Sequence, residues 1–393
     1  MRVLVAHVSY RQRGGEDAIV DTEVRLLREA GHDVSTLLVP SDRLSLLPKS
    51  RQLAIGAHLG DHSYGRRLVR EAIARSRAEV VHFHNLYPLL GSGAMREAAA
   101  LGCAAVQTFH NYRLSCIAGT HFRAGAICEQ CSPSHHMNGV VRGCYRESRL
   151  QSLAMAGGVS RHWDVLCSAE IPDVGICLTE FMRDRLINLG APPEALVVKS
   201  NSVEASCRTA PWVERDGAVF VGRLSPEKGI AELVAAWPGD APALTVVGTG
   251  PLLSRVRREA GPNVNIIGEA PIGQVRSLLS AARVCVIPSV CFEGLPTVVL
   301  EAFAEGTPAV GFALGALTAV LAEQGTCATA ERGDFQALCE FAVASAVQNA
   351  GEWNTVSSRA RSAYAEHYSD ASNAAALESV YALACHRAHA RRG

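Results

Sequence analysis

The chain alternates short apolar runs with helix-like segments. In its first half, residues 16–31 place Ile19, Val20 and Val24 on one face of a helix that Gly31 can end. The apolar runs of this half lie at 2–8, 33–39, 79–84, 104–109 and 173–179. Continuous apolar strands divided by helices are typical of a parallel sheet that is covered on both faces. The sequence therefore predicts an α/β fold.

The same alternation restarts after a polar, proline-containing stretch near residues 200–217. The apolar runs of the second half lie at 218–224, 243–248, 263–268, 283–289 and 307–312. This repetition predicts two Rossmann-like, doubly wound domains, 1–204 and 205–370, that face a cleft. Ligands of such sheets bind beyond the carboxyl ends of the strands, so we expect the functional residues there.

Composition excludes several classes of protein. The chain has 393 residues, of which 48% are hydrophobic and 19% charged, and its formal net charge is zero. This composition is typical of a globular protein, and the balanced charge gives no indication of a basic surface that would bind nucleic acid. The first apolar run is too short for a signal peptide, and no stretch approaches the roughly 20 apolar residues of a spanning helix. We expect a cytoplasmic protein that can also act at the inner face of the membrane, although residues 42–75 show no strongly basic amphipathic face.

The stretch "CFEGLPTVVLEA" at 291–302 places Glu293 and Glu301 with seven residues between them. Pro296 is expected at the first position of a helix, whose free N–H groups would attract a phosphate. Glu301 is then expected about two turns into that helix. A carboxylate can accept both hydroxyls of a ribose, and a second can bind a pyranose. Nucleoside, diphosphate and sugar are the parts of an activated sugar donor. Two surface glutamates beside a turn, the alternative, would explain neither Gly294 nor Pro296.

A second motif, "GRLSPEKG" at 222–229, follows an apolar run. Arg223 and Lys228 would project from the carboxyl end of that strand, where two cations suit a diphosphate. Taken alone, the motif fits two solvated surface charges equally well.

Together, "GRLSPEKG" and "EGLPTVVLE" resemble the retaining glycosyltransferases of family 4 (group 1), which have the GT-B fold. "RGGED", "HNYRLSC" and "LTEFMRDRLINLG" extend the resemblance over nearly the whole chain. The resemblance implies that Glu301 holds the donor ribose and Glu293 the donor sugar. It also implies that Arg223 and Lys228 bind the diphosphate and offset charge on the leaving nucleotide.

The resemblance assigns further residues. The helix start formed by Gly294, Leu295, Pro296 and Thr297 would cradle the donor phosphates. Gly14 and Gly15, in the first loop of the N-terminal domain, would close over the phosphate and sugar. His110 would lie beside the transferred sugar, whereas a lone histidine after a strand is more often a structural residue. The segment 371–393 would be a helix that packs back on the N-terminal domain.

A cysteine-rich loop spans residues 116–144. Cys116, Cys128, Cys131 and Cys144 form a C-x11-C-x2-C-x12-C pattern, whose central C-x2-C suits two thiolates on one tetrahedral ion. The pattern predicts a structural Zn2+ site, with His135 or His136 as possible substitutes for one ligand. Reduced, unliganded thiols are the alternative. A shell filled by four thiolates leaves no open position for chemistry, so this loop would shape the acceptor side.

The resulting hypothesis is a retaining, metal-independent glycosyltransferase. The nucleotide-diphosphate sugar would be the donor substrate, and the acceptor would be a hydroxyl of a saccharide, a lipid-linked saccharide or a natural product. The chain has no D-x-D motif, which agrees with stabilisation of the diphosphate by cations and a helix terminus. A nucleotide-sugar 2-epimerase of the same fold, a pyridoxal-dependent phosphorylase and a non-catalytic sugar-nucleotide binder remain alternatives. The sequence does not identify the donor, the acceptor or the oligomeric state.

Overall fold

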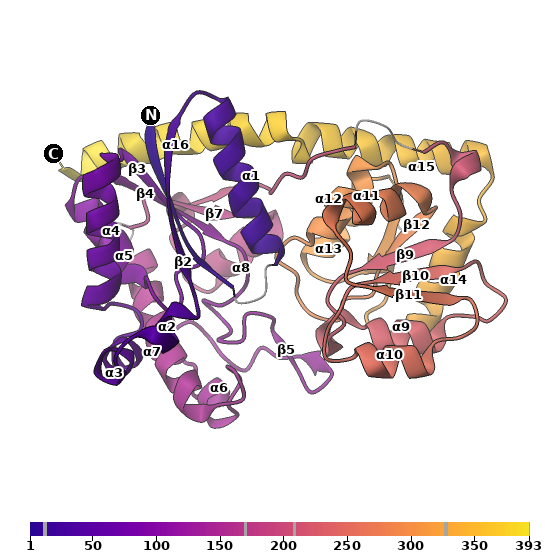
Figure 1. The fold of residues 1–393 in the computed structure, drawn as a ribbon, viewed down its shortest axis with the longest axis horizontal. Coiled ribbons are helices and arrows are strands. Elements are labelled where there is room, and N and C mark those ends of the chain that lie inside the picture. The colour runs from indigo at the N-terminus through magenta and orange to yellow at the C-terminus, as the bar shows by residue number, and fades with distance from the viewer. Residues whose placement is uncertain (11–13, 169–170, 207–209, 326–328, 393) are drawn as a thin grey trace. The chain divides into compact units, whose positions relative to one another are not determined.

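A computed structural model describes residues 1–392 except 11–13, 169–170, 207–209 and 326–328. The chain divides into two compact units (Figure 1). Unit 1 comprises residues 1–121, 128–201 and 373–392, and unit 2 comprises 122–127 and 202–372. The final helix therefore belongs, from residue 373 on, with the N-terminal part of the chain.

Unit 1 is built on a six-stranded parallel sheet with the order β2-β1-β3-β4-β7-β8. Its strands are β1 (Arg2–Ser9), β2 (Asp33–Pro40), β3 (Val80–Phe83), β4 (Ala104–Phe109), β7 (Val174–Cys177) and β8 (Leu196–Val198). Chain order reverses between β1 and β3. Polar side chains that follow β1, β3 and β4 therefore meet at one edge of the sheet.

Helices α1 and α16 share one hydrophobic core with this sheet. Val20, Val24 and Leu27 of α1 pack with Leu377 and Tyr381 of α16 against inward-facing valines of the strands. The helices of unit 1 are α1 (Gly15–Glu29), α2 (Arg43–Leu46), α3 (Lys49–Ala57), α4 (Ser63–Ser76), α5 (Ser92–Ala100), α6 (Met137–Val141), α7 (Arg149–Cys167), α8 (Glu180–Asn188) and α16 (Asp370–Arg392). Each fully buried leucine of this core contributes about 1.5–3 kcal/mol to folding.

Unit 2 has a second six-stranded parallel sheet, with the Rossmann order β11-β10-β9-β12-β13-β14. Its strands are β9 (Ala218–Val221), β10 (Leu244–Val247), β11 (Val264–Gly268), β12 (Val284–Ile287), β13 (Ala309–Phe312) and β14 (Thr329–Ala330). Its main helices are α9 (Ile230–Ala236), α10 (Leu253–Glu259), α11 (Ile272–Ala281), α12 (Thr297–Ala304), α13 (Ala316–Ala322), α14 (Phe335–Ala346) and α15 (Ala350–Ala363). The switch point of this sheet lies between β9 and β12.

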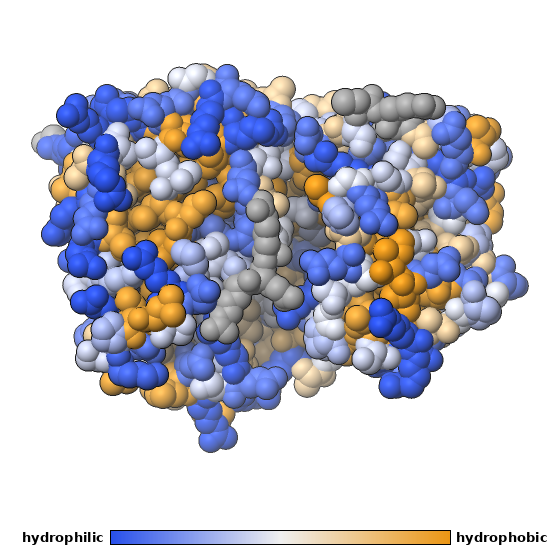
Figure 2. All heavy atoms as spheres, in the orientation of Figure 1, coloured by the Kyte–Doolittle hydropathy of each residue, from blue (hydrophilic) through white to orange (hydrophobic). Residues whose placement is uncertain are grey.

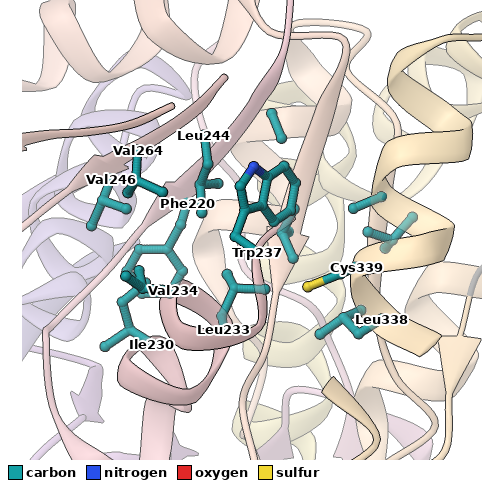
Figure 3. Close-up of a cluster of buried hydrophobic side chains, with 14 of the residues drawn as sticks. Phe220, Ile230, Leu233, Val234, Trp237, Leu244, Val246, Val264, Leu338 and Cys339 are labelled. Atoms are coloured by element: carbon teal, nitrogen blue, oxygen red, sulfur yellow. The ribbon is translucent and has the colours of Figure 1, made fainter. Parts of the chain in front are cut away.

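The core of unit 2 fixes the helix that follows β9. Figure 3 shows Phe220 of β9 beside Ile230, Val234 and Trp237, which α9 and the residue after it supply. Leu338 and Cys339 of α14 close the same cluster. Because α9 is held this way, the loop between β9 and α9 has fixed ends.

The apolar runs expected from the sequence correspond to ten of the strands in these two sheets. β8 and β14 have three and two residues and were not expected, and neither was the two-stranded hairpin of β5 (Phe122–Arg123) and β6 (Ala126–Ile127). Such short strands carry too little sequence for a period-two pattern.

Candidate functional site

The site in unit 2 forms at the switch point of its sheet. Arg223 and Lys228 follow β9, and Glu293 follows β12, which is the neighbouring strand. Lys228 Nζ lies 2.5 Å from Glu293 Oε1, and Ser289 Oγ donates a hydrogen bond to the same oxygen at 2.6 Å. Two motifs separated by more than sixty residues thus meet in one ion pair, which is where doubly wound sheets bind ligands.

Both members of the ion pair stay charged. Burial alone would raise the pKa of Glu293, but the Lys228 ammonium and the hydrogen bonds from Lys228 and Ser289 hold it below its usual value. Burial likewise opposes the charge of Lys228, yet Glu293 raises its pKa. Lys228 is therefore a cation held at the carboxyl edge of the sheet, and a phosphate could compete with Glu293 for it.

The loop that carries Lys228 depends on Gly229. This residue has φ +66°, and a Cβ built on it would lie 2.1 Å from the carbonyl oxygen of Pro288, at the end of β12. Only glycine combines that backbone conformation with that close approach. Arg223, on the same loop, is exposed, and its guanidinium makes no ion pair within 4.0 Å in the described part of the chain.

Helix α12 begins one residue later than expected. Pro296 is its N-cap and Thr297 its first residue, and no side chain caps this end. Gly294, Leu295 and Pro296 lead into the helix, and the N–H of Val299 already bonds to Pro296. The N–H groups of Thr297 and Val298 have no intrahelical acceptor, so this end can receive an anion.

Glu301 lies closer to that helix end than the sequence predicted. It is the fifth residue of α12, just over one turn from Thr297, so the expectation of two turns was wrong. The helix starts at Thr297 because its N-terminal extension turns at Gly294 and Pro296. Burial raises the pKa of Glu301, and Arg276 of α11 is the cation that opposes this shift. No hydrogen bond or ion pair to its carboxylate occurs among the described residues, which leaves both oxygens available to hydroxyl donors.

Unit 1 contains a buried polar cluster between its sheet and helices α1 and α16. Lys199 Nζ lies 2.5 Å from Glu23 Oε1, and the side chains are 2% and 1% exposed. His84 Nε2 lies 3.4 Å from Glu23 Oε2, and His82 Nδ1 lies 2.9 Å from the Tyr381 hydroxyl. Burial lowers the pKa of His82 and His84 well below the usual value, so both are neutral. Burial opposes ionisation of Glu23, but the charge and hydrogen bond of Lys199, together with His84 and His110, hold the pKa of that carboxyl below its usual value.

His110 is connected to this cluster. It follows β4, and its Nε2 lies 2.8 Å from His84 Nδ1, with the two rings stacked at 5.1 Å. Burial lowers the pKa of His110 as well. A narrow pocket beside His110 is lined by Glu16, Tyr87 and Arg113, among others. The sequence pointed to His110, but it gave no signal for Glu23, Lys199 or Arg113, because their partners are distant in the chain.

Gly14 and Gly15 form the start of α1. Gly14 is the N-cap, its N–H donates to Asp17 Oδ2 at 2.9 Å, and Gly15 is the first helical residue. The sequence placed them in the loop before the helix, with the helix starting at residue 16. Both residues are exposed, and a Cβ on Gly14 would meet no atom within 4 Å.

The two sequence halves match known families. Residues 13–206 match the family model described as Glycosyltransferase Family 4, and residues 215–347 match the one described as Glycosyl transferases group 1. The chain belongs to the group 1 glycosyltransferase family. The first match lies mostly in unit 1 and the second lies within unit 2.

Curated relatives of this family member include a putative teichuronic acid biosynthesis glycosyltransferase, TuaC, from Bacillus subtilis, which is 40% identical over 105 residues, or 26% of each chain. A phosphatidyl-myo-inositol mannosyltransferase from Mycolicibacterium smegmatis is 26% identical over 82% of this chain and 79% of its own. The first three curated relatives are each matched over less than half of their length.

Solved structures show the same fold. Anabaena HepE in complex with UDP has a TM-score of 0.65 at 15% identity, over 97% of this chain and all of that one. Sucrose-phosphate synthase from Thermosynechococcus elongatus has a TM-score of 0.67 at 17% identity, over 97% and 98%. The glycosyltransferase family member described here therefore has the α/β GT-B fold.

The four cysteines of the loop are brought near one another. Burial raises the pKa of Cys131, and the neighbouring thiols Cys116, Cys128 and Cys144 raise it further. None of the four is in a disulfide. Among the described residues, the one group of three potential ligand atoms within 4.8 Å of one another is Glu23, His82 and His84. No three of the four thiols therefore lie that close together. The Glu23 cluster already pairs its carboxylate with Lys199, which disfavours a cation there.

The same loop places its two histidines differently: His136 is buried and His135 is exposed.

In the described residues, no helix has the length and hydropathy of a membrane-spanning segment.

Proposed function

We propose that the protein transfers a sugar from a nucleotide-diphosphate sugar to a hydroxyl of an acceptor, with retention of the anomeric configuration. The observation that supports this most is the Lys228–Glu293 ion pair at the switch point between β9 and β12, beside the uncapped start of α12. A cation, a carboxylate and free N–H groups meet there, and an activated sugar needs all three.

Each residue has a role in this proposal. Arg223 and Lys228 bind the diphosphate together with the helix start at Gly294–Thr297. Glu301 accepts the ribose hydroxyls and Glu293 the hydroxyls of the donor sugar. In unit 1, His110 contacts the transferred sugar, and Gly14 and Gly15 approach the donor phosphate and sugar.

In the chemical step, the bond between the anomeric carbon and the diphosphate oxygen breaks, and the acceptor oxygen bonds to the same face of that carbon. The acceptor proton passes to the departing phosphate. Lys228, Arg223 and the N–H groups of α12 offset the charge that develops on the leaving group. No divalent ion is needed for this stabilisation.

The acceptor class is proposed from the relatives' names. Teichuronic acid and phosphatidyl-inositol are a polysaccharide and a lipid, so we propose a saccharide or lipid-linked acceptor. The experiment is an incubation of the purified protein with UDP-, GDP-, ADP- and dTDP-sugars, with and without EDTA, followed by analysis of the nucleotide and sugar products. Release of one nucleoside diphosphate that EDTA does not affect supports the proposal. An epimerised donor, or no turnover of any donor, contradicts it.

We also propose that Cys116, Cys128, Cys131 and Cys144 hold a structural zinc ion. Thiolates are the ligands that zinc prefers in such loops, and four of them leave no open coordination position. We expect about one zinc per chain by elemental analysis, and its loss in Cys128→Ser or Cys131→Ser. Cys167→Ser, at an exposed thiol outside the loop, is the matched control. A wild-type protein that contains no zinc and has the same melting temperature as the two variants would contradict this proposal and leave the four cysteines as ordinary thiols.

A further inference from the structure

Two histidines share one hydrogen bond at the carboxyl edge of the unit 1 sheet. His84 follows β3 and His110 follows β4, and His84 Nδ1 lies 2.8 Å from His110 Nε2. Burial lowers the pKa of both rings, so each neutral ring carries a proton on only one of its nitrogens. A hydrogen bond between two ring nitrogens needs a proton on one and a lone pair on the other. The ring that donates therefore determines what the second nitrogen of His110, Nδ1, can do.

Glu23 favours one of the two directions. Figure 2 shows hydrophilic side chains at the surface over α1, but Glu23 of this helix is buried, with its side chain 1% exposed. Its Oε2 lies 3.4 Å from His84 Nε2, and neither of these two buried atoms has a hydrogen-bond partner in the described part of the chain. Because an ionised carboxylate can only accept, it attracts the proton of His84 to Nε2. His84 Nδ1 is then a lone pair, and His110 is the donor of the shared hydrogen bond.

The surroundings of Glu23 keep it ionised and leave His84 as the partner of Oε2. Burial opposes ionisation of Glu23, but the Lys199 ammonium, 2.5 Å from Oε1, holds the pKa of this carboxyl below its usual value. His82 is the second ring near Oε2, at 3.7 Å, but both of its nitrogens are already hydrogen-bonded to hydroxyl groups, at 2.9 and 2.8 Å. The N–H groups therefore point from His110 to His84 and from His84 to Glu23.

We propose that Glu23 and His84 are positioning residues that hold His110 in the tautomer with its proton on Nε2. His110 Nδ1 then presents a lone pair, and it makes no hydrogen bond among the residues that the structure describes. The inference rests on the proposed function for the identity of the ligand, since Nδ1 accepts a hydrogen bond from a hydroxyl of the donor sugar. The contacts end on a carboxylate, whose charge polarises both rings in the same direction and makes Nδ1 a stronger acceptor.

Nitrogen NMR of the full chain with isotope-labelled histidine tests the direction without any ligand. The variants His84→Leu and His110→Leu assign the signals of the two rings. In the wild type we expect the shared proton on His110 Nε2, with a coupling through the hydrogen bond to His84 Nδ1. A shared proton on His84 Nδ1 would overturn the proposal.

Glu23→Met with Lys199→Met tests whether the carboxylate sets this direction. The double variant removes the carboxylate and its counter-ion together, so no buried charge is left without a partner. The shared proton should then be distributed over both rings. The kcat/KM for donor turnover should fall about tenfold, which corresponds to the loss of one good hydrogen bond.

His32→Leu is the matched control. His32 precedes β2, at the opposite edge of the same sheet, and its Nε2 lies 3.6 Å from Glu378 in another contact between a histidine and a carboxylate. This variant should keep the wild-type signals of His84 and His110 and the wild-type turnover.

Two further results would overturn the proposal. A shared proton that stays on His110 Nε2 in the double variant means that Glu23 does not set the direction. A kcat/KM equal to that of the wild type means that the tautomer does not affect the donor. Failure of the sugar-transfer proposal is a different result, namely no donor turnover by the wild type, and the spectra do not depend on it.

Discussion

Removal of the Lys199 ammonium should destabilise unit 1 strongly. The side chains of Lys199 and Glu23 are 2% and 1% exposed, and their charged atoms are 2.5 Å apart. In Lys199→Met the Glu23 carboxylate would remain buried with two neutral histidines as its polar neighbours. Loss of one partner of a buried ion pair costs about 3–5 kcal/mol, because the other charge is left uncompensated. We expect a loss of that size at pH 7.5 in urea unfolding.

The stabilities of the wild type and of Lys199→Met should change with pH in opposite directions. In the wild type, Lys199 holds the pKa of Glu23 below its usual value, so this group contributes stability above that value and loses it as pH falls. In Lys199→Met the main group that lowers the pKa of Glu23 is gone, so burial raises that pKa and the variant loses stability as pH rises. The difference between the two proteins should therefore grow from pH 5.5 to 7.5.

Two controls separate this effect from lost packing. Glu23→Gln with Lys199→Met removes both charges and should be more stable than Lys199→Met alone. Lys49→Met changes an exposed lysine and should stay within about 0.5 kcal/mol of the wild type. Hydrogen exchange of peptides from β3 and α16 would locate the change in unit 1. A Lys199→Met protein within about 1 kcal/mol of the wild type at pH 7.5 would refute the reasoning.

Three further predictions follow from the two units. Burial lowers the pKa of His162 to about 4 and those of His82 and His84 well below their usual values. Since the unfolded chain protonates these residues first, stability should fall as pH drops below about 6.5, with His162 alone costing about 3 kcal/mol by pH 4; unfolding curves that do not change between pH 7 and 5 would contradict this. Gly229→Ala should cost more than about 2 kcal/mol and weaken donor binding, because its Cβ would strike the Pro288 carbonyl, whereas Gly273→Ala has open space and should be neutral or stabilising; equal melting temperatures of the two variants would be evidence against the close approach. Lys228→Ala should lower donor turnover by about a hundredfold or more while the protein stays folded, and turnover at the wild-type rate would remove its role.

The elements of the fold were readable because each carries its own pattern. β4 was expected at 104–109 and has those bounds, since its six residues, four of them apolar, form one buried run. The switch-point motifs were also readable, because glycine and proline mark the turns beside Glu293 and Lys228. The start of α12 was misplaced because Pro296 fits both the N-cap and the first helical position. That one-residue error shifts Glu301 by only about a quarter of a turn, so most of the difference from the expected two turns lies in the turn count itself, because Glu301 is about 1.4 turns from Pro296.

Long-range partners could not be read. Glu23 sits in a helix that looks ordinarily amphipathic, and Lys199 lies 176 residues away, so only the fold brings the two together. The same holds for Arg276, which approaches Glu301 from the preceding helix. A sequence shows which side chains can be charged, but their burial and their partners depend on the tertiary structure.

The central claim is that Glu301 holds the ribose of a donor bound at the switch point of unit 2. Calorimetric titration should compare the nucleoside diphosphate released in the donor screen with its 2′,3′-dideoxy counterpart. In the wild type the ribose form should bind about tenfold to a hundredfold more tightly, as expected for hydrogen bonds to a carboxylate. In Glu301→Ala the two nucleotides should bind equally. A ribose preference that persists in Glu301→Ala, or a wild-type protein that binds neither nucleotide, would contradict the account.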